Sequence, residues 1–172
     1  IGFDHVANLL EIHMHAALLG AEQVHVQAED LLSHPLFFLW LIHKHRVSHT
    51  FAPNFFLHMV ERKLEEKGSN MCQHEFDLSC SKKIVSGGEA NVVQTCIKLL
   101  KRLSPYGLRE DAICIAYGLT ESCGGITYRT FSSMDELAGG HVIASVGTSI
   151  PGAQIRIATV GGGSRSLRGR KS

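Results

Sequence analysis

The sequence predicts an α/β fold in which a largely parallel sheet is flanked by helices. Segments whose apolar residues recur at helical spacing alternate along the chain with short runs of strand composition. Such alternation is typical of parallel strands joined by crossover helices. The chain has 172 residues, of which 44% are hydrophobic, and this is enough for one buried core but not for two full domains.

The expected helices are bounded by residues that begin or end helices. Gly20 follows the first helix at the position of a C-terminal glycine cap. Ser33 is the expected N-cap of the second helix, with Pro35 near its first turn. The expected helices cover about residues 7–19, 34–45, 55–67 and 90–103, with a helical turn at 132–137.

The expected strands are short and rich in β-branched or apolar residues. They cover residues 23–26, 47–52, 82–86, 113–116 and 153–159, the last as an edge strand, while 124–128 fit either a strand or a loop. Glycine and proline punctuate residues 145–152, which predicts a turn region. The strand over 82–86 stops at Gly87-Gly88, and the strand over 113–116 stops at Tyr117-Gly118.

Charge and hydropathy argue against two kinds of partner. The net charge is +1, so we expect no nucleic-acid surface on the body of the chain. Residues 161–172 contain mainly Gly, Ser and Arg, and we expect them to form a disordered basic tail. The longest apolar run, 35–42, is far shorter than the roughly 20 residues of a membrane span. We therefore expect no membrane partner and a cytoplasmic location.

Polar and aromatic side chains follow the two strands that end in glycine. The carboxyl ends of strands in an open α/β sheet form the edge where ligands bind. There, a hydroxyl at Thr120 can donate to phosphate, a carboxylate at Glu121 can hold Mg²⁺, and Tyr117 offers a flat face for a base. Two simpler readings stay open: the glycines form tight turns only, and Thr120-Glu121 form the first turn of a helix.

These motifs resemble the central part of the adenylate-forming superfamily, which includes acyl and aryl CoA ligases, luciferases and the adenylation domains of nonribosomal peptide synthetases. The resemblance is carried by GGE at 87–89, YGLTE at 117–121 and GTSIPG at 147–152. Three longer stretches are most similar to fungal synthetase-like proteins: FDHVANLLEIH at 3–13, TFAPNFFL at 50–57 and IVSGGEANVV at 84–93. The similarity extends from about residue 3 to residue 157.

The resemblance implies that residues 1–160 are part of the large N-terminal domain of an adenylate-forming enzyme. Members of the superfamily activate a carboxylic acid with MgATP, release pyrophosphate and pass the acyl group to a thiol. In a complete synthetase-like parent, this thiol is the phosphopantetheine of a carrier domain.

The resemblance also implies roles for individual residues. The nucleotide would contact Gly87, Gly88, Glu89, Tyr117, Gly118 and Thr120. The carboxylic acid would lie against Asp4, His5, Asn8, Ile84, Ser86 and Ala116. Thr120, Glu121 and His5 would be the catalytic residues, with Glu121 holding Mg²⁺. Because the acid pocket is largely uncharged if Asp4 points elsewhere, a buried ammonium group would be costly, and we favour an aryl or keto acid over an amino acid.

Several motifs of the superfamily are not found in these 172 residues. They are the glycine-rich phosphate loop with its lysine, the Tyr-x-Thr-Gly-Asp motif that holds the ribose, and the small C-terminal domain with the catalytic lysine. We therefore expect a fragment of an ATP-dependent, carboxylic-acid-activating ligase that is inactive alone. The alternative is a non-catalytic remnant that binds a nucleotide or another protein.

Overall fold

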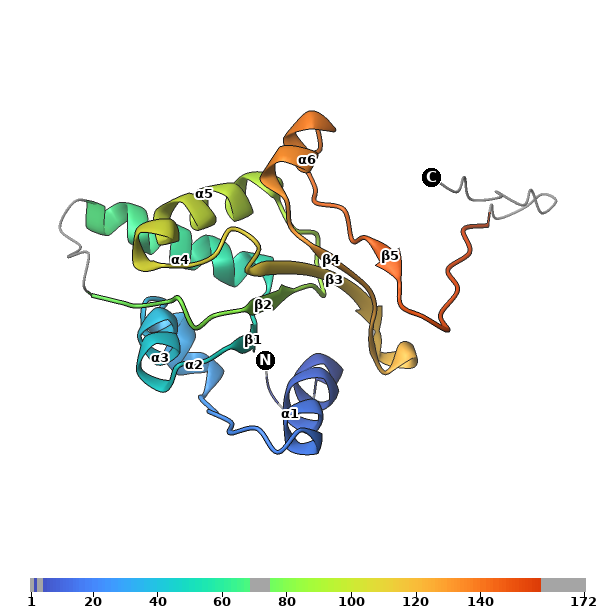
Figure 1. Ribbon diagram of the computed structural model, residues 1–172, viewed down its shortest axis with the longest axis horizontal. Helices are drawn as coiled ribbons and strands as arrows, with labels where there is room; N and C mark the ends of the chain where they lie inside the picture. Colours follow the sequence, from blue (N-terminus) through green and yellow to red (C-terminus); the bar gives the residue numbers. More distant parts are fainter. Residues whose placement is uncertain (1, 3–4, 69–74, 159–172) are drawn as a thin grey trace.

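The computed structural model of the protein describes residues 2, 5–68 and 75–158. In these ranges five strands form one sheet in the order β1-β2-β3-β4-β5, and helices flank it (Figure 1). The strands are β1 (His49–Phe51), β2 (Lys83–Ser86), β3 (Ile113–Leu119), β4 (Gly124–Thr130) and β5 (Thr148–Ser149). The predicted α/β class is confirmed. Asp4 and the tail at 161–172 lie outside the described residues.

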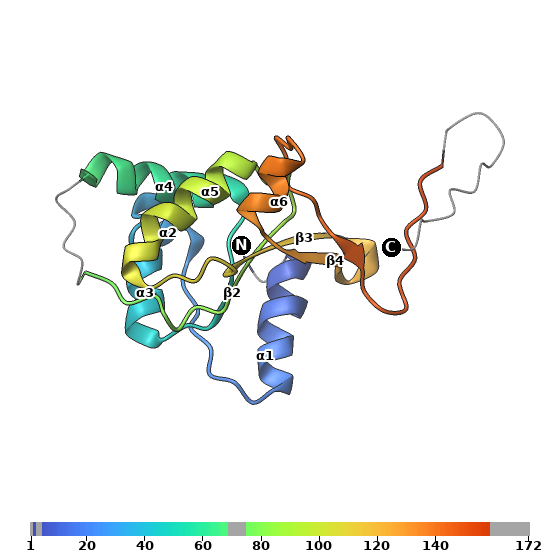
Figure 2. The same ribbon diagram turned by 45° about the horizontal axis from the view of Figure 1, so that its top comes forward.

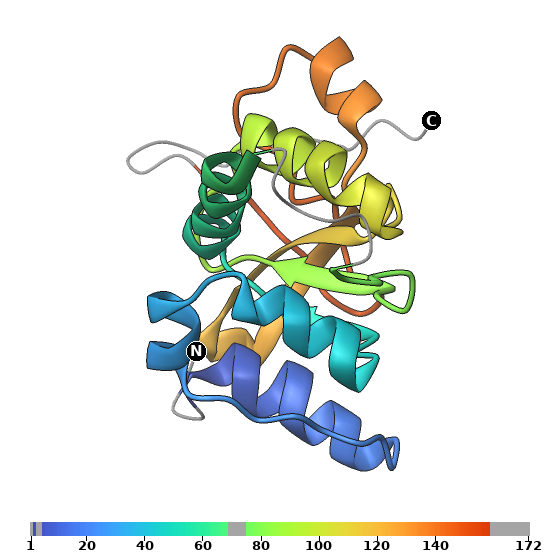
Figure 3. The same ribbon diagram turned by 90° about the vertical axis from the view of Figure 1, so that its left-hand side faces the viewer.

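Helices lie on both sides of the sheet. On one side are α4 (Asn54–Lys67) and α5 (Val93–Leu103); on the other is an N-terminal helix formed by the π-helix η1 (Ala7–Met14) and α1 (His15–Leu18) (Figures 2 and 3). The remaining α-helices are α2 (Ala28–Ser33), α3 (Phe37–His45) and α6 (Ser133–Ala138). Among the described residues, no helix combines the length and apolar character needed to cross a bilayer.

The sheet changes from parallel to antiparallel at β3. β1 pairs with β2 and β2 with β3 in parallel, whereas β3 pairs with β4 and β4 with β5 in antiparallel orientation. Only a short 3₁₀ turn, η4 (Thr120–Ser122), and Cys123 separate β3 from β4. A connection of this length allows a hairpin but not a parallel crossover. The parallel arrangement predicted from the alternating pattern therefore describes β1 to β3 only.

The end of β3 differs from the prediction. The strand does not stop at Tyr117-Gly118 but continues to Leu119, because β4 pairs with these residues and a bulge between Tyr117 and Gly118 adjusts the register. A Cβ atom on Gly118 would lie 2.0 Å from the carbonyl oxygen of Gly124. Gly118 thus permits close approach of two backbones in a strand and is not the end of that strand.

Three further predictions about local structure are wrong. Residues 23–26 and 153–158 form no strand, since neither pairs with another strand in the described part of the chain. The edge strand lies earlier, at Thr148–Ser149, within the predicted turn region. Ser33 is the last residue of α2 and not the N-cap of α3, which begins at Phe37 after a turn. The extended backbone at 23–26 instead contacts the N-terminal helix, where Gln23 Oε1 lies 2.8 Å from His13 Nδ1.

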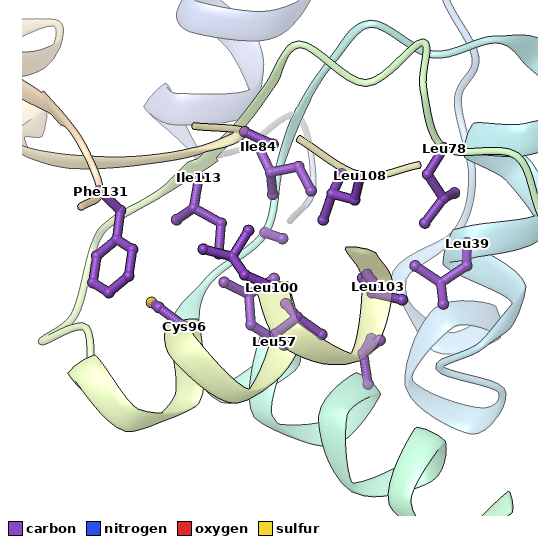
Figure 4. Packing of buried hydrophobic residues seen from close by; sticks show 14 of the residues in the cluster. Leu39, Leu57, Leu78, Ile84, Cys96, Leu100, Leu103, Leu108, Ile113 and Phe131 are labelled. Carbon is purple, nitrogen blue, oxygen red and sulfur yellow. The ribbon is translucent and has the colours of Figure 1, made fainter. Parts of the chain in front are cut away.

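The hydrophobic core lies between the sheet and the α4–α5 layer. Ile84 of β2 and Ile113 of β3 point toward Leu57 of α4 and Leu100 and Leu103 of α5 (Figure 4). The helical spacing of apolar residues in α5 is therefore confirmed as a buried stripe. Full burial of a leucine or isoleucine side chain contributes about 1.5–3 kcal/mol, so this layer holds β2 and β3 in place.

A salt bridge joins the middle of α4 to the last turn of α5. The carboxylate of Glu61 is almost completely buried and accepts a hydrogen bond from Arg102 Nε at 2.9 Å. Arg102 also donates to Glu65 at 2.7 Å. Arg102 therefore gives the buried carboxylate of Glu61 a partner of opposite charge.

Candidate functional site

The loop that follows β2 lies beside the middle of β3. Ser86, the last residue of β2, is in register with Ile115 of β3, so the glycine loop (Gly87, Gly88 and Glu89) begins beside Ala116. A Cβ atom on Gly87 would lie only 2.4 Å from the carbonyl oxygen of Ala116. The first glycine is therefore required by close approach of the loop to β3, while the second has a φ of +78° that favours glycine.

The glycine loop is open toward solvent and is attached to α4. Nothing lies within 4 Å of a Cβ atom built on Gly88. Glu89 is exposed, and its Oε1 accepts a hydrogen bond from the backbone N–H of Phe55 at 2.8 Å. Glu89 therefore caps the N-terminus of α4, whose first N–H groups have no partner within the helix. The structure thus gives Glu89 a contact that its motif did not predict.

The end of β3 and the turn that follows it present three of the predicted residues. Tyr117 is 42% exposed at the end of the parallel part of β3, and Thr120 and Glu121 are exposed on η4. Ser122 holds the turn, since its hydroxyl accepts the N–H of Leu119 at 3.0 Å. Thr120 and Glu121 also lie in the first turn of a short helix, as the structural alternative expects. An exposed ring on β3, followed by an exposed hydroxyl and carboxylate on the turn, can bind an aromatic base, a phosphate and a cation.

The residues predicted for the acid pocket fall on two faces of the sheet. Asn8 is half-buried on η1, and Ala116 lies on the same face of β3 as Cys114, which lines a groove together with Asn8. Ile84 is 1% exposed, and it and Ser86 face the α4–α5 layer. The structure therefore does not bring Ile84 and Ser86 together with Asn8.

His5 is exposed just before η1. Its Nδ1 accepts the backbone N–H of Ala7 at 3.2 Å, so the imidazole caps the beginning of this helix. The contact engages one ring nitrogen and leaves the side chain accessible to solvent.

The groove on this face extends between the N-terminal helix, α3 and strands β1 to β4. Its volume is about 2400 Å³. A pocket for one small molecule measures about 300–1,000 Å³, so most of this space is wider than one ligand needs. Asn8, Glu11 and Tyr128 line the part near β4.

Glu11 was not identified by its sequence pattern. Its Oε1 accepts hydrogen bonds from the backbone N–H of Gly125 and from the phenol of Tyr128, the latter at 2.9 Å. Burial first, and then the hydrogen bond to Glu11, raise the pKa of Tyr128 well above its usual range. Gly124 and Gly125 leave room for the carboxylate, because a Cβ atom on either would contact Glu11 Oε1. These contacts join η1 to the β3–β4 hairpin.

Two buried asparagines beneath the glycine loop were also missed. Asn54, the first residue of α4, accepts the backbone N–H of Val92 at 3.0 Å. Asn91 accepts the hydroxyl of Ser86 at 2.5 Å. The only signal for Asn54 was its position after Pro53 at the start of a predicted helix, and the stretch at 84–93 contained Asn91 without indicating its contacts.

The family is shown by comparison with known proteins. A model described as "AMP-binding enzyme" matches residues 3–169, which is nearly the whole chain. The chain belongs to the AMP-binding enzyme family. Two curated fungal relatives of this AMP-binding chain are microperfuranone synthase of Emericella nidulans, 42% identical over 93% of the chain, and nonribosomal peptide synthetase apvA of Aspergillus terreus, 43% identical over 91%. The chain spans about 17% of the length of each.

Solved structures of adenylation domains have the same fold as this AMP-binding chain. McyG A-PCP complexed with phenylalanyl-adenylate is 37% identical with a TM-score of 0.79, and covers 88% of this chain and 23% of its own. The adenylation domain of a keto acid-selecting module, bound to keto acyl adenylate, is 28% identical with a TM-score of 0.70. That match covers 76% of this chain and 24% of the solved one.

Proposed function

We propose that this chain forms the part of an adenylation domain at which a nucleotide meets a carboxylic acid, in an acid-activating ligase of nonribosomal peptide synthetase-like type. One observation carries the proposal: the glycine loop after β2 lies against the backbone of Ala116, and β3 continues from there through Tyr117 to Thr120 and Glu121 on the turn. This is the edge of an α/β sheet where ligands bind. Family membership and the adenylates bound in two solved relatives support the same assignment.

The exposed groups at this edge fit the parts of ATP with Mg²⁺. The open face of Gly87, Gly88 and Glu89 would lie beside the adenine, with the ring of Tyr117 stacked on it. Gly118 permits the close approach of the β3 and β4 backbones. The hydroxyl of Thr120 would donate to phosphate. The carboxylate of Glu121 would hold Mg²⁺, which supplies charge neutralisation at the phosphates when bound.

The acid would lie on the face that carries His5, Asn8 and Ala116. Asp4 remains part of this proposed site and lies outside the described residues. Ile84 and Ser86 were predicted for the same pocket, but both side chains are buried against the α4–α5 layer and do not lie on this face.

We favour an aryl or keto acid for the case in which Asp4 points away from the pocket, because an ammonium group would then lie against Asn8 and Ala116, which carry no charge. The nearby carboxylate of Glu11 is already hydrogen-bonded to Gly125 and Tyr128. Solved relatives with phenylalanyl and keto acyl adenylates represent both classes of acid. A carrier domain with phosphopantetheine is the proposed acceptor of the acyl group, and the A-PCP form of McyG supports this choice.

Nucleotide binding by the chain tests the proposal. Titration with AMP, and with ATP in the presence and absence of Mg²⁺, should give saturable binding by calorimetry. Tyr117→Ala should weaken the binding of both AMP and ATP, because it removes the aromatic ring on which the adenine would stack. Glu121→Gln should weaken only the Mg²⁺-dependent increment. A chain that binds neither nucleotide would favour the alternative of a non-catalytic protein-interaction module.

A further inference from the structure

We propose that Asn54 and Asn91 are positioning residues that hold the glycine loop in the conformation used by the nucleotide. This inference rests on the proposed function. Neither side chain needs to touch the nucleotide, since Asn54 is 8% exposed and Asn91 is 2% exposed. Both act through the loop backbone and through its attachment to α4.

The first support is a pair of hydrogen bonds that cross between α4 and the loop segment. The side chain of Asn54 accepts the N–H of Val92 at 3.0 Å, just before α5 begins. In the opposite direction, Glu89 accepts the N–H of Phe55 at 2.8 Å. Glu89 therefore accepts a backbone N–H at the start of α4, and Asn54 accepts the backbone N–H just before α5. These two hydrogen bonds fix Glu89 and Val92 relative to the N-terminus of α4.

The second support is the side chain of Asn91, which connects the two ends of the loop. Its Oδ1 accepts the hydroxyl of Ser86 at 2.5 Å, and its Nδ2 lies 3.3 Å from the carbonyl of Ser86 and 3.4 Å from that of Glu89. The backbone carbonyl of Asn91 also accepts the N–H of Ala144 at 2.8 Å. Because Ser86 and Glu89 stand on either side of the two glycines, the side chain of Asn91 holds the two ends of the loop at a fixed distance.

The buried network gives a flexible sequence one conformation. Two adjacent glycines lose more backbone entropy on ordering than any other residues would. The loop is ordered because Asn91 holds its ends, Asn54 holds the segment that follows, and Gly87 packs against the backbone of Ala116. A fully satisfied buried polar network specifies one arrangement, whereas an apolar replacement would leave backbone groups unpaired. The nucleotide then binds a loop that needs no further ordering.

Asn54 offers the sharper test, because a substitution can keep or remove its acceptor. Asn54→Ala removes the partner of the Val92 N–H, while Asn54→Asp keeps an acceptor at a helix N-terminus that favours negative charge. The matched control is Arg102→Gln, which breaks the contact between the last turn of α5 and Glu61 in the middle of α4. For each protein, we would measure the dissociation constant for AMP, the melting temperature and the hydrogen exchange of residues 86–92.

We expect Asn54→Ala to weaken AMP binding about tenfold, as for one lost buried hydrogen bond and a looser loop, and Asn54→Asp to stay within about twofold of wild type. Exchange at 86–92 should be faster in Asn54→Ala only. Arg102→Gln should lower the melting temperature and leave AMP affinity unchanged. If Asn91→Ala folds, it should bind AMP as weakly as Asn54→Ala does. If it does not fold, the comparison of Asn54→Ala with Asn54→Asp still tests the proposal.

Two results would overturn the inference. One is AMP affinity in Asn54→Ala equal to that of wild type; the other is a loss that simply follows the melting temperature in all variants, Arg102→Gln included. If the wild-type chain binds no AMP, the proposed function fails. The exchange data then still decide whether Asn54 orders the loop: unchanged exchange at 86–92 in Asn54→Ala rejects it, and selective acceleration supports it.

Discussion

Adding one methyl group to the first glycine of the glycine loop tests the contact on which the site depends. In Gly87→Ala the new Cβ atom would lie 2.4 Å from the carbonyl oxygen of Ala116 and 3.2 Å from its carbonyl carbon. Ordinary van der Waals contact begins near 3.4 Å, so the two backbones must separate by about 1 Å. Neither neighbour is a flexible side chain that can turn aside.

The expected cost follows from this overlap. Overpacking of a well-packed site destabilises by about 1–3 kcal/mol. For a chain of this size the melting temperature should fall by about 2–4 °C for each kcal/mol. The nucleotide should also bind more weakly, because the loop moves away from Tyr117. Denaturant unfolding followed by circular dichroism, together with AMP titration, measures both effects.

Gly88→Asn is the control for the adjacent position. Gly88 has open space around its Cβ direction and a φ of +78°, a conformation that asparagine tolerates better than other residues. We expect this variant to lose less than about 1 kcal/mol. If Gly87→Ala unfolds at the same denaturant concentration as wild type, the loop and β3 are not in the contact described above, and the reasoning is refuted.

Four further predictions concern titration, reactivity and catalysis. Tyr128 should remain a neutral phenol at pH values where an exposed tyrosine ionises, and Glu11→Ala should lower its pKa in an ultraviolet titration; an unchanged pKa would leave burial as its sole cause. Burial raises the pKa of Cys96 to about 12, so alkylation at pH 8 followed by mass spectrometry should modify exposed Cys123 well before Cys96, and equal rates would contradict the burial. The 172-residue chain should give only background pyrophosphate exchange with any acid, since losing one electrostatic donor costs about 10²-fold to 10³-fold and several are missing; ATP-dependent exchange would disprove this. In a longer relative, replacing the glutamate that matches Glu121 with glutamine should lower activity steeply, with partial recovery at high Mg²⁺; an unchanged Mg²⁺ dependence would assign that residue to the turn alone.

The sign of the Tyr128 effect on stability follows from the direction of its pKa shift. Because the folded-state pKa lies above that of the unfolded chain, the stabilising contribution is complete below the ordinary tyrosine pKa of about 10 and is lost as the pH rises through the folded value. Unfolding measured between pH 9 and higher alkaline values should therefore show a smaller loss in Tyr128→Phe than in wild type.

The sequence predicted those helices and strands in which several residues contribute to one regular pattern. The apolar stripe of α5 and the strands at β2 and β3 are clear from spacing and composition because several residues contribute to each signal. The extension of β3 to Leu119 was not predictable in this way, since it depends on β4 as a pairing partner. Residues 23–26 alternate like a strand, but a strand also needs a neighbour, and composition alone does not supply one.

The candidate site was predictable only where motifs present side chains directly. Tyr117, Thr120 and Glu121 were predicted because their residue types match the chemistry of a nucleotide, and all three are exposed in the structure. Glu11 contacts Gly125 and Tyr128 across more than a hundred residues of sequence, and no local pattern marks such a contact. The burial of Ile84 and Ser86 against the α4–α5 layer was not predicted, because the sequence Lys-Ile-Val-Ser has no polar–apolar alternation that tells the two faces apart, although alternate residues are buried in the structure.

The change of strand direction at β3 has a consequence for how the two halves of the site form. The β3–β4 turn is closed by residues adjacent in sequence, so the loop-closure entropy of placing Thr120 and Glu121 is small. The pairing of β1 with β2 is different, since His49 meets Lys83 only after the intervening α4 has been wrapped back onto the sheet. One half of the site therefore depends on local order, and the other on the assembly of the whole α4–α5 layer. Substitutions in the core between β2 and the α4–α5 layer should therefore disturb the glycine loop more than the β3–β4 turn.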